Sequence, residues 1–142
     1  MPLKVLTILL FSISLFGCNA GNIKPKTPGV GSVKVIPDEK VYLTVDIQSG
    51  NVLSVSRGES SGNITFELSK MSSGMMLSAS NTLDQIVKYD IYMIDYNGNK
   101  HYTSSCPMMA GAGVFESWPH NIPQLSIENF RVLAASDELA CQ

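Results

Sequence analysis

The chain has 142 residues, of which 44% are hydrophobic and 15% are charged, with a formal net charge of -2. Its length suits one domain, and its hydrophobic share excludes an intrinsically disordered chain. Because ten lysines and arginines stand against twelve aspartates and glutamates, the chain lacks the strongly basic surface that binds phosphates, and we expect no nucleic-acid partner.

The N-terminal residues have the pattern of a secretory signal peptide. Lys4 supplies a positive charge ahead of an apolar run at residues 5–16, VLTILLFSISLF. As a helix this run would rise about 18 Å, which is too little to cross a hydrocarbon core of roughly 30 Å. We therefore interpret it as the hydrophobic region of an export signal and not as a membrane span.

A cysteine follows this run directly, in the sequence Leu15-Phe16-Gly17-Cys18. A leucine three positions before the cysteine and a small residue next to it resemble the lipobox of bacterial lipoproteins. The resemblance covers this segment alone. It implies cleavage between Gly17 and Cys18, a lipid on the Cys18 sulfur, and acylation of the new amino group by a chain such as palmitate. The alternative is an ordinary secretory signal in which Cys18 has no role.

The same resemblance bears on location. An aspartate after the lipidated cysteine favours the inner membrane in enteric-type bacteria, so Asn19 at this position implies the outer membrane. Each buried methylene of the acyl chains contributes about 0.8 kcal/mol, and two lipid signals already anchor a protein stably. We expect a signal peptide at residues 1–17, a lipidated N-terminus and flexible Gly/Pro-containing tether at residues 18–32, and a folded domain at residues 33–142.

The folded domain shows short runs in which apolar and polar residues alternate, as in half-buried strands. An Asn97-Gly98 pair marks a hairpin turn. No window has a convincing helical stripe. The pattern predicts an all-β fold, an antiparallel β-sandwich of immunoglobulin-like type with about seven or eight short strands. The clearest runs are residues 41–47, 52–57, 64–68, 75–79, 86–96, 101–106 and 125–133.

Three cysteines are present, and lipidation of Cys18 would leave Cys106 and Cys141 as one pair. Export supplies an oxidising compartment, so we predict a structural disulfide between these two residues. Closing a loop of about 35 residues contributes up to roughly 4 kcal/mol in the chain-entropy model. The alternative is a reactive thiol, but neither cysteine belongs to a CxxC pair or adjoins a basic residue.

Groups that could support catalysis are sparse. His101 and His120 are the only histidines, and neither has neighbours at metal-ligand spacing, so we expect no metal, no cofactor and no catalytic base. Asp90 and Asp95 lie five positions apart on one predicted strand and therefore point to opposite faces. The sequence also lacks a GxSxG elbow and a phosphate-binding loop.

Two groups of residues are candidate partner contacts. Tyr92 and Tyr96 belong to a tyrosine cluster on the predicted hairpin, where exposed tyrosines suit protein or glycan binding; cross-strand aromatic packing is the alternative that we favour. Residues 107–120, PMMAGAGVFESWPH, lack alternation and are too apolar for a solvated loop. They form either an adaptable contact surface or a plug for one end of the sandwich, and we favour the plug. Their candidate contacts are Met108, Met109, Phe115 and Trp118.

These observations favour a non-enzymatic lipoprotein of the cell envelope. It would be attached to the membrane through covalent lipid and would bind an envelope protein or a glycan, or play a structural role. A second hypothesis is an inhibitor of a secreted enzyme such as a lysozyme or a protease. A less favoured hypothesis is an enzyme whose residues meet only in the folded chain, and a cleft that joins His101 or His120 to an acid would support it.

The predicted lipid anchor can be tested by replacing the sulfur atom of Cys18. Cys18→Ser should abolish labelling of the protein by an alkyne palmitate and should release the protein from the membrane fraction, because serine offers no thiol to the lipid. Labelling that persists in the Cys18→Ser protein would contradict the lipobox interpretation.

Overall fold

The computed structural model describes residues 31–142, so the predicted signal peptide, Cys18 and most of the tether lie outside the described residues. The described part contains nine strands and no helix. No helix that could cross a membrane lies among residues 31–142. The strands are β1 (Val33–Val35), β2 (Lys40–Gln48), β3 (Asn51–Gly58), β4 (Ile64–Met71), β5 (Gly74–Asn81), β6 (Ile86–Ile94), β7 (Lys100–Thr103), β8 (Gly113–Trp118) and β9 (Gln124–Leu133).

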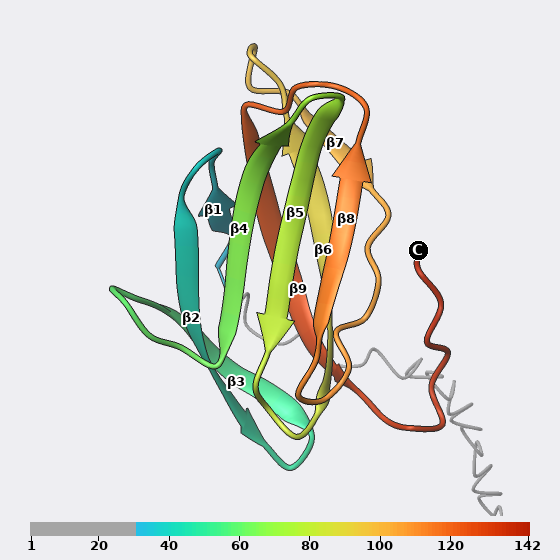
Figure 1. Ribbon diagram of the computed structural model, residues 1–142. Helices are drawn as coiled ribbons and strands as arrows, with labels where there is room; N and C mark the ends of the chain where they lie inside the picture. The colour runs from blue at the N-terminus through green and yellow to red at the C-terminus, as the bar shows by residue number, and fades with distance from the viewer. Residues whose placement is uncertain (1–30) are drawn as a thin grey trace, which may run out of the picture.

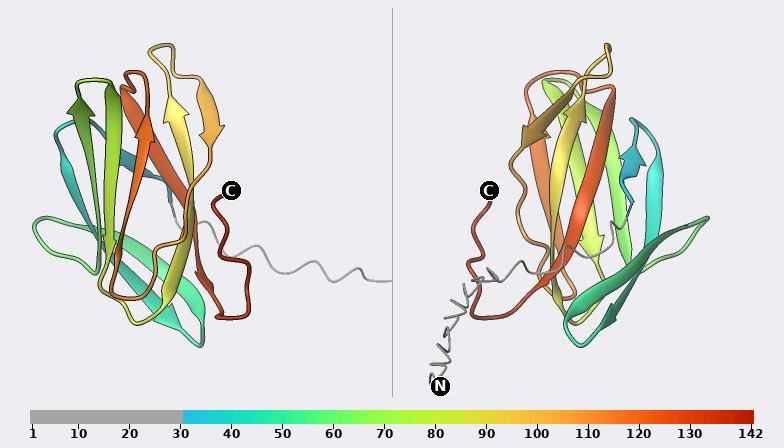
Figure 2. Two further views of the ribbon diagram at one scale, coloured as in Figure 1. Left: turned by 45° about the vertical axis from the view of Figure 1, so that its right-hand side comes forward. Right: turned by 180° about the vertical axis from the view of Figure 1, so that it is seen from behind.

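The strands form two antiparallel sheets that pack face to face (Figures 1 and 2). The four-stranded sheet has the order β1-β9-β6-β7, and the five-stranded sheet has the order β3-β2-β4-β5-β8. The hairpins β2–β3, β4–β5 and β6–β7 and the connection from β3 to β4 stay within one sheet. The connections from β1 to β2, β5 to β6, β7 to β8 and β8 to β9 cross between sheets. The prediction of an all-β antiparallel sandwich is confirmed.

Alternation along the strands builds the core. In β2, Val41, Leu43 and Val45 are buried while the residues between them are exposed or half-buried. At the centre, Phe66 of β4 meets the ring of Tyr89 of β6 edge-on, with the ring centroids 5.2 Å apart. The ring of Phe130 of β9 lies 6.3 Å from that of Phe66. These aromatic contacts join the two sheets.

The predicted strand runs include neither the short β1 nor strand β8, which lies within the segment 107–120. Strand β8 pairs with β5 and forms an edge of the five-stranded sheet. Its inward-facing row holds Val114, Glu116 and Trp118, so a charged residue interrupts the apolar alternation. Glu116 is accommodated there because its Oε1 accepts a hydrogen bond of 2.7 Å from the Cys106 backbone N–H.

The segment 107–120 separates into core and surface residues. Met108 is fully buried, and its backbone pairs with Val87 through hydrogen bonds of 2.9 and 3.0 Å. Trp118 is buried as well, and its Nε1–H donates to Thr103 Oγ1 over 3.0 Å. The idea of a shared contact surface is therefore wrong for Met108 and Trp118, which belong to the core, whereas Met109 and Phe115 are exposed.

The predicted disulfide between Cys106 and Cys141 is present. Beside it, Ser105 and Gln142 exchange two backbone hydrogen bonds of 2.6 and 3.1 Å, as in a short antiparallel pair. The hydroxyl of Tyr102 donates to the Gln142 carbonyl oxygen over 2.8 Å. The C-terminal residues are thus held against the segment that follows β7.

Lys88 lies close to this arrangement and is the only charged residue that is buried within residues 31–142. Its ammonium group donates to the Ser105 carbonyl oxygen. Burial, and then the positive charge of Arg131, lower the pKa of Lys88 below its usual value. The hydrogen bond to Ser105 gives the buried ammonium a polar partner.

The neighbouring residues Met108 and Met109 give a matched pair for a stability test. Met108→Ala should lower the free energy of unfolding by about 2–5 kcal/mol, because it leaves a cavity between the sheets. Met109→Ala should change it by less than about 0.5 kcal/mol, since that side chain is 45% exposed. Urea unfolding followed by circular dichroism measures both, and equal losses would contradict the placement of Met108 in the core.

Candidate binding groove

Four connections meet at one end of the sandwich, which is the upper end in Figure 1. They are residues 36–39 between β1 and β2, residues 72–73 between β4 and β5, residues 95–99 between β6 and β7, and residues 119–123 between β8 and β9. Two pockets open there, with volumes of about 230 and 240 Å³. Because four residues line both pockets, they form one continuous groove: Tyr96, Asn121, Ile122 and Pro123.

The first pocket has an apolar floor and a polar rim. Its apolar lining comes from the end of β6 and from the connection between β8 and β9, and consists of Met93, Ile94, Ile122 and Pro123. The rim carries both histidines of the chain, together with an acid and an amide side chain. Tyr96 is 82% exposed, which is the highest value among the large hydrophobic residues that the structure exposes.

The carboxylate of Asp95 organises the connection between β6 and β7. Its Oδ1 accepts backbone hydrogen bonds from Asn97 and Asn99 of 2.9 and 2.8 Å. Its Oδ2 accepts from the Asn99 side chain over 2.9 Å and lies 3.1 Å from His101 Nε2. Gly98 completes the turn with a φ of 84°, which glycine adopts without strain. The turn expected at Asn97-Gly98 is therefore present.

These hydrogen bonds also determine ionisation. The side chains of Asn99 and His101, followed by the backbone of Asn99, hold the pKa of Asp95 well below its usual value. Since an ionised carboxylate only accepts hydrogen bonds, the Nε2 of His101 carries the proton that faces Asp95. The side chain of Asp95 therefore acts as an acceptor that fixes the loop beneath Tyr96.

His101 and His120 line the same pocket, although no sequence motif links them. Together with Asp95 they line the first pocket, which is the kind of cleft that the enzyme hypothesis requires. However, no serine, threonine or cysteine lines either pocket, and Asp95 is engaged in the turn. Within residues 31–142, no cluster of three or more His, Cys, Asp or Glu side chains could hold a metal ion.

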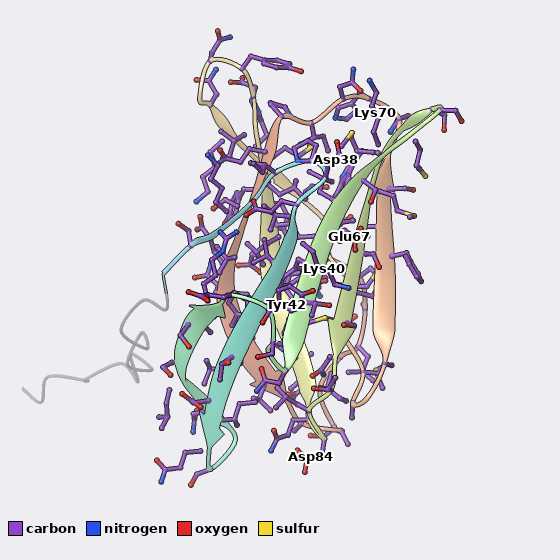
Figure 3. The ribbon with its side chains drawn as sticks, turned by 60° about the vertical axis from the view of Figure 1, so that its left-hand side comes forward. Asp38, Lys40, Tyr42, Glu67, Lys70 and Asp84 are labelled. Atoms are coloured by element: carbon purple, nitrogen blue, oxygen red, sulfur yellow. A yellow bond between two sulfur atoms is a disulfide. The ribbon has the colours of Figure 1, made fainter. Side chains whose placement is uncertain are left out.

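The second pocket contains two opposite charges, Asp38 and Lys70, which Figure 3 shows at the same end of the sandwich. Lys70 continues the inward-facing row of β4 one step beyond the buried Leu68, so its side chain is placed where the core ends. Asp38 has a φ of 63°, and its backbone N–H donates to the Leu68 carbonyl oxygen over 2.8 Å. Met75 lies at the bottom of the pocket and is buried.

Neither charge was singled out as a binding residue from the sequence. In the fold, Glu39 forms an ion pair with Arg57, whereas its neighbour Asp38 lines the groove. The one sequence feature that could have indicated this role for Lys70 is its position in the alternating row of Phe66 and Leu68. A charged residue at an inward-facing position lies at the end of a strand when it is not paired inside the core.

The other tyrosines of the hairpin have structural roles. Tyr92 and Tyr102 pack edge-on across the strands with ring centroids 5.5 Å apart, which confirms the packing alternative for Tyr92. Lys100 Nζ lies 4.0 Å from the centre of the Tyr92 ring and 2.7 Å from the carboxylate of Glu128. Burial opposes ionisation of Glu128, but hydrogen bonds from Lys100 and Ser126 bring its pKa below the usual value.

The remaining candidate residues do not line the groove. Tyr89 is fully buried, and burial, with Glu116 nearby, raises the pKa of its hydroxyl. Asp90 pairs with Arg131 at 3.0 Å and accepts a hydrogen bond from Asn129, so it is not brought together with Asp95. Phe115 and Met109 are exposed, but neither lines a pocket of the groove.

Comparison of the chain with protein-family models, with curated proteins and with solved structures finds no match.

The ionisation of Asp95 predicts how stability depends on pH. Its pKa is depressed in the folded chain, so its stabilising contribution is present above about pH 4 and is lost as the pH falls below the unfolded value of about 3.9. Asp95→Asn should therefore lower the melting temperature at pH 7 and have a smaller effect at pH 3. Asp84→Asn is the control, because Asp84 is exposed at the opposite end of the sandwich (Figure 3) and has no hydrogen-bond partner within residues 31–142. An Asp95→Asn deficit that is equal at both pH values would contradict this role.

Proposed function

We propose that this protein is a lipid-anchored, non-enzymatic binding module of the bacterial cell envelope, held at the outer membrane, which binds a partner in the groove at the loop end of its sandwich. The observation that carries the proposal is the combination of an apolar floor, a polar rim and a tyrosine that is 82% exposed between two pockets. Binding sites have this composition, and tyrosine is enriched in them because it contributes area and a hydroxyl at low entropic cost.

The direction of β1 supports this role. Val33 pairs with Ile127 and Val35 with Leu125, so β1 runs toward the end of the sandwich at which β9 begins. The groove lies at that end, because the connection between β8 and β9 lines it. A tether that leads into β1 would thus join the domain at the end of β1 that is farther from the groove, and it would leave the groove open to a partner.

The rigidity of the loop supports binding as well. The Asp95 carboxylate holds residues 95–99 through four hydrogen bonds before any partner arrives. A loop that is already ordered loses less conformational entropy when it binds, so more of the contact energy appears as affinity.

A second function is an inhibitor of a secreted enzyme, such as a lysozyme or a protease. The observation that favours it is the shape of the hairpin between β6 and β7, which projects beyond the other connections in Figure 1. Tyr96 lies in this projecting connection, where the backbone N–H groups of Asn97 and Asn99 donate to the Asp95 carboxylate. A rigid loop with an exposed aromatic side chain can enter the cleft of an enzyme and block it.

Photo-crosslinking in intact cells tests the binding role. A benzophenone amino acid at position 96 should give a crosslinked product with an envelope component, whereas the same amino acid at position 53 should not. Leu53 is a suitable control because it is 58% exposed on β3, outside both pockets. A secreted hydrolase in the product would select the inhibitor function. Absence of a product at position 96, or equal products at both positions, would contradict the proposal.

A further inference from the structure

The second pocket holds one acid and one base that do not neutralise each other. Within residues 31–142, the side chains of Asp38 and Lys70 take part in no ion pair, although each lines the same pocket. Neither side chain has a hydrogen-bond partner in that part of the chain. The pocket therefore presents a separated pair of opposite charges to an occupant.

The first pocket favours an apolar group, unlike the charged second pocket. Its volume of about 230 Å³ exceeds that of an engineered apolar cavity of roughly 150 Å³ that accommodates benzene, so an aromatic or branched side chain fits. Its apolar lining favours such a side chain over a sugar hydroxyl or an ion. Since Tyr96 and Ile122 belong to both pockets, one occupant that fills the groove must be apolar in one part and dipolar in the next.

We propose that the groove binds an extended segment of a partner protein, which places an apolar side chain in the first pocket and a neighbouring pair of oppositely charged side chains against Asp38 and Lys70. This inference rests on the proposed function and names the partner class for the same groove. In an extended segment, each residue rises about 3.3 Å and successive side chains point to opposite faces, so alternate positions, about 6.6 Å apart, reach adjacent pockets on one surface. A neutral glycan would leave both charges without partners.

Selection from a peptide library tests the proposal directly. The probe is a library of hexapeptides with acetylated N-termini and amidated C-termini, so that every charge lies on a side chain, applied to the full-length protein purified in detergent. The selected peptides should carry an apolar residue together with one basic and one acidic residue, with the apolar residue and the nearer charged residue at alternate positions. Tyr96→Ala should weaken their binding at least tenfold, whereas Tyr102→Ala should not, because Tyr102 is exposed but lies outside the groove.

Two charge variants assign the roles of the second pocket. Asp38→Asn should remove the preference for the basic residue and keep the preference for the acidic one. Asparagine is chosen because it tolerates the positive φ of 63° at this position. Lys70→Glu should replace the acidic preference by a basic one. Both side chains are exposed, so unchanged melting temperatures should accompany the altered selection.

Selections that are the same for the wild type and both charge variants would overturn the proposal, as would the absence of any selected peptide. A polysaccharide crosslinked at position 96 would also overturn it, while leaving the binding role of the groove intact. Absence of any crosslinked product at position 96 would instead remove the binding role itself, so the two failures are distinguishable.

Discussion

The packing of two sheets against each other is the constraint on which every other feature depends. Phe66 from one sheet meets Tyr89 and Phe130 from the other, and these rings set the separation and alignment of the layers. The connections that form the groove come from both sheets, since β4 and β8 belong to one layer and β6 and β9 to the other. The pockets exist only while the layers hold these connections at a fixed spacing.

Features that depend on neighbouring residues could be predicted from the sequence, whereas features that depend on residues far apart in the chain could not. Alternation in β2 and β6 predicted the sandwich, because each of those strands buries one face. The pairing of Cys106 with Cys141 followed once Cys18 was assigned to lipid. Strand β8 was not predicted because Glu116 occupies an inward-facing position. Its carboxylate is accommodated there because it accepts a hydrogen bond from the Cys106 backbone N–H. Local periodicity carries no information about such a partner.

The groove was not predictable for the same reason. Asp38, Lys70, Tyr96 and Asn121 come from four separate connections or strand ends, and only the pairing of the sheets places them around one hollow. One part of the site could be predicted from the sequence. The Asn97-Gly98 turn fixes the register of the β6–β7 hairpin, and this register places Met93 opposite His101. That register brings His101 to Asp95 across the turn. The neighbours of this pair, which come from the connection between β8 and β9, depend on the whole fold.

The attachment of the C-terminal residues affects how copies of the chain meet one another. Edge strands present unpaired N–H and C=O groups, and two such edges can join into a continuous sheet. The backbone pair of Ser105 with Gln142 occupies part of the edge beyond β7, and the disulfide next to it prevents the covering residues from leaving. Molecules anchored on a membrane would be crowded at high local concentration, where aggregation through open edges is most favoured. The disulfide therefore keeps this part of the edge covered and leaves the end of the sandwich that carries the groove open.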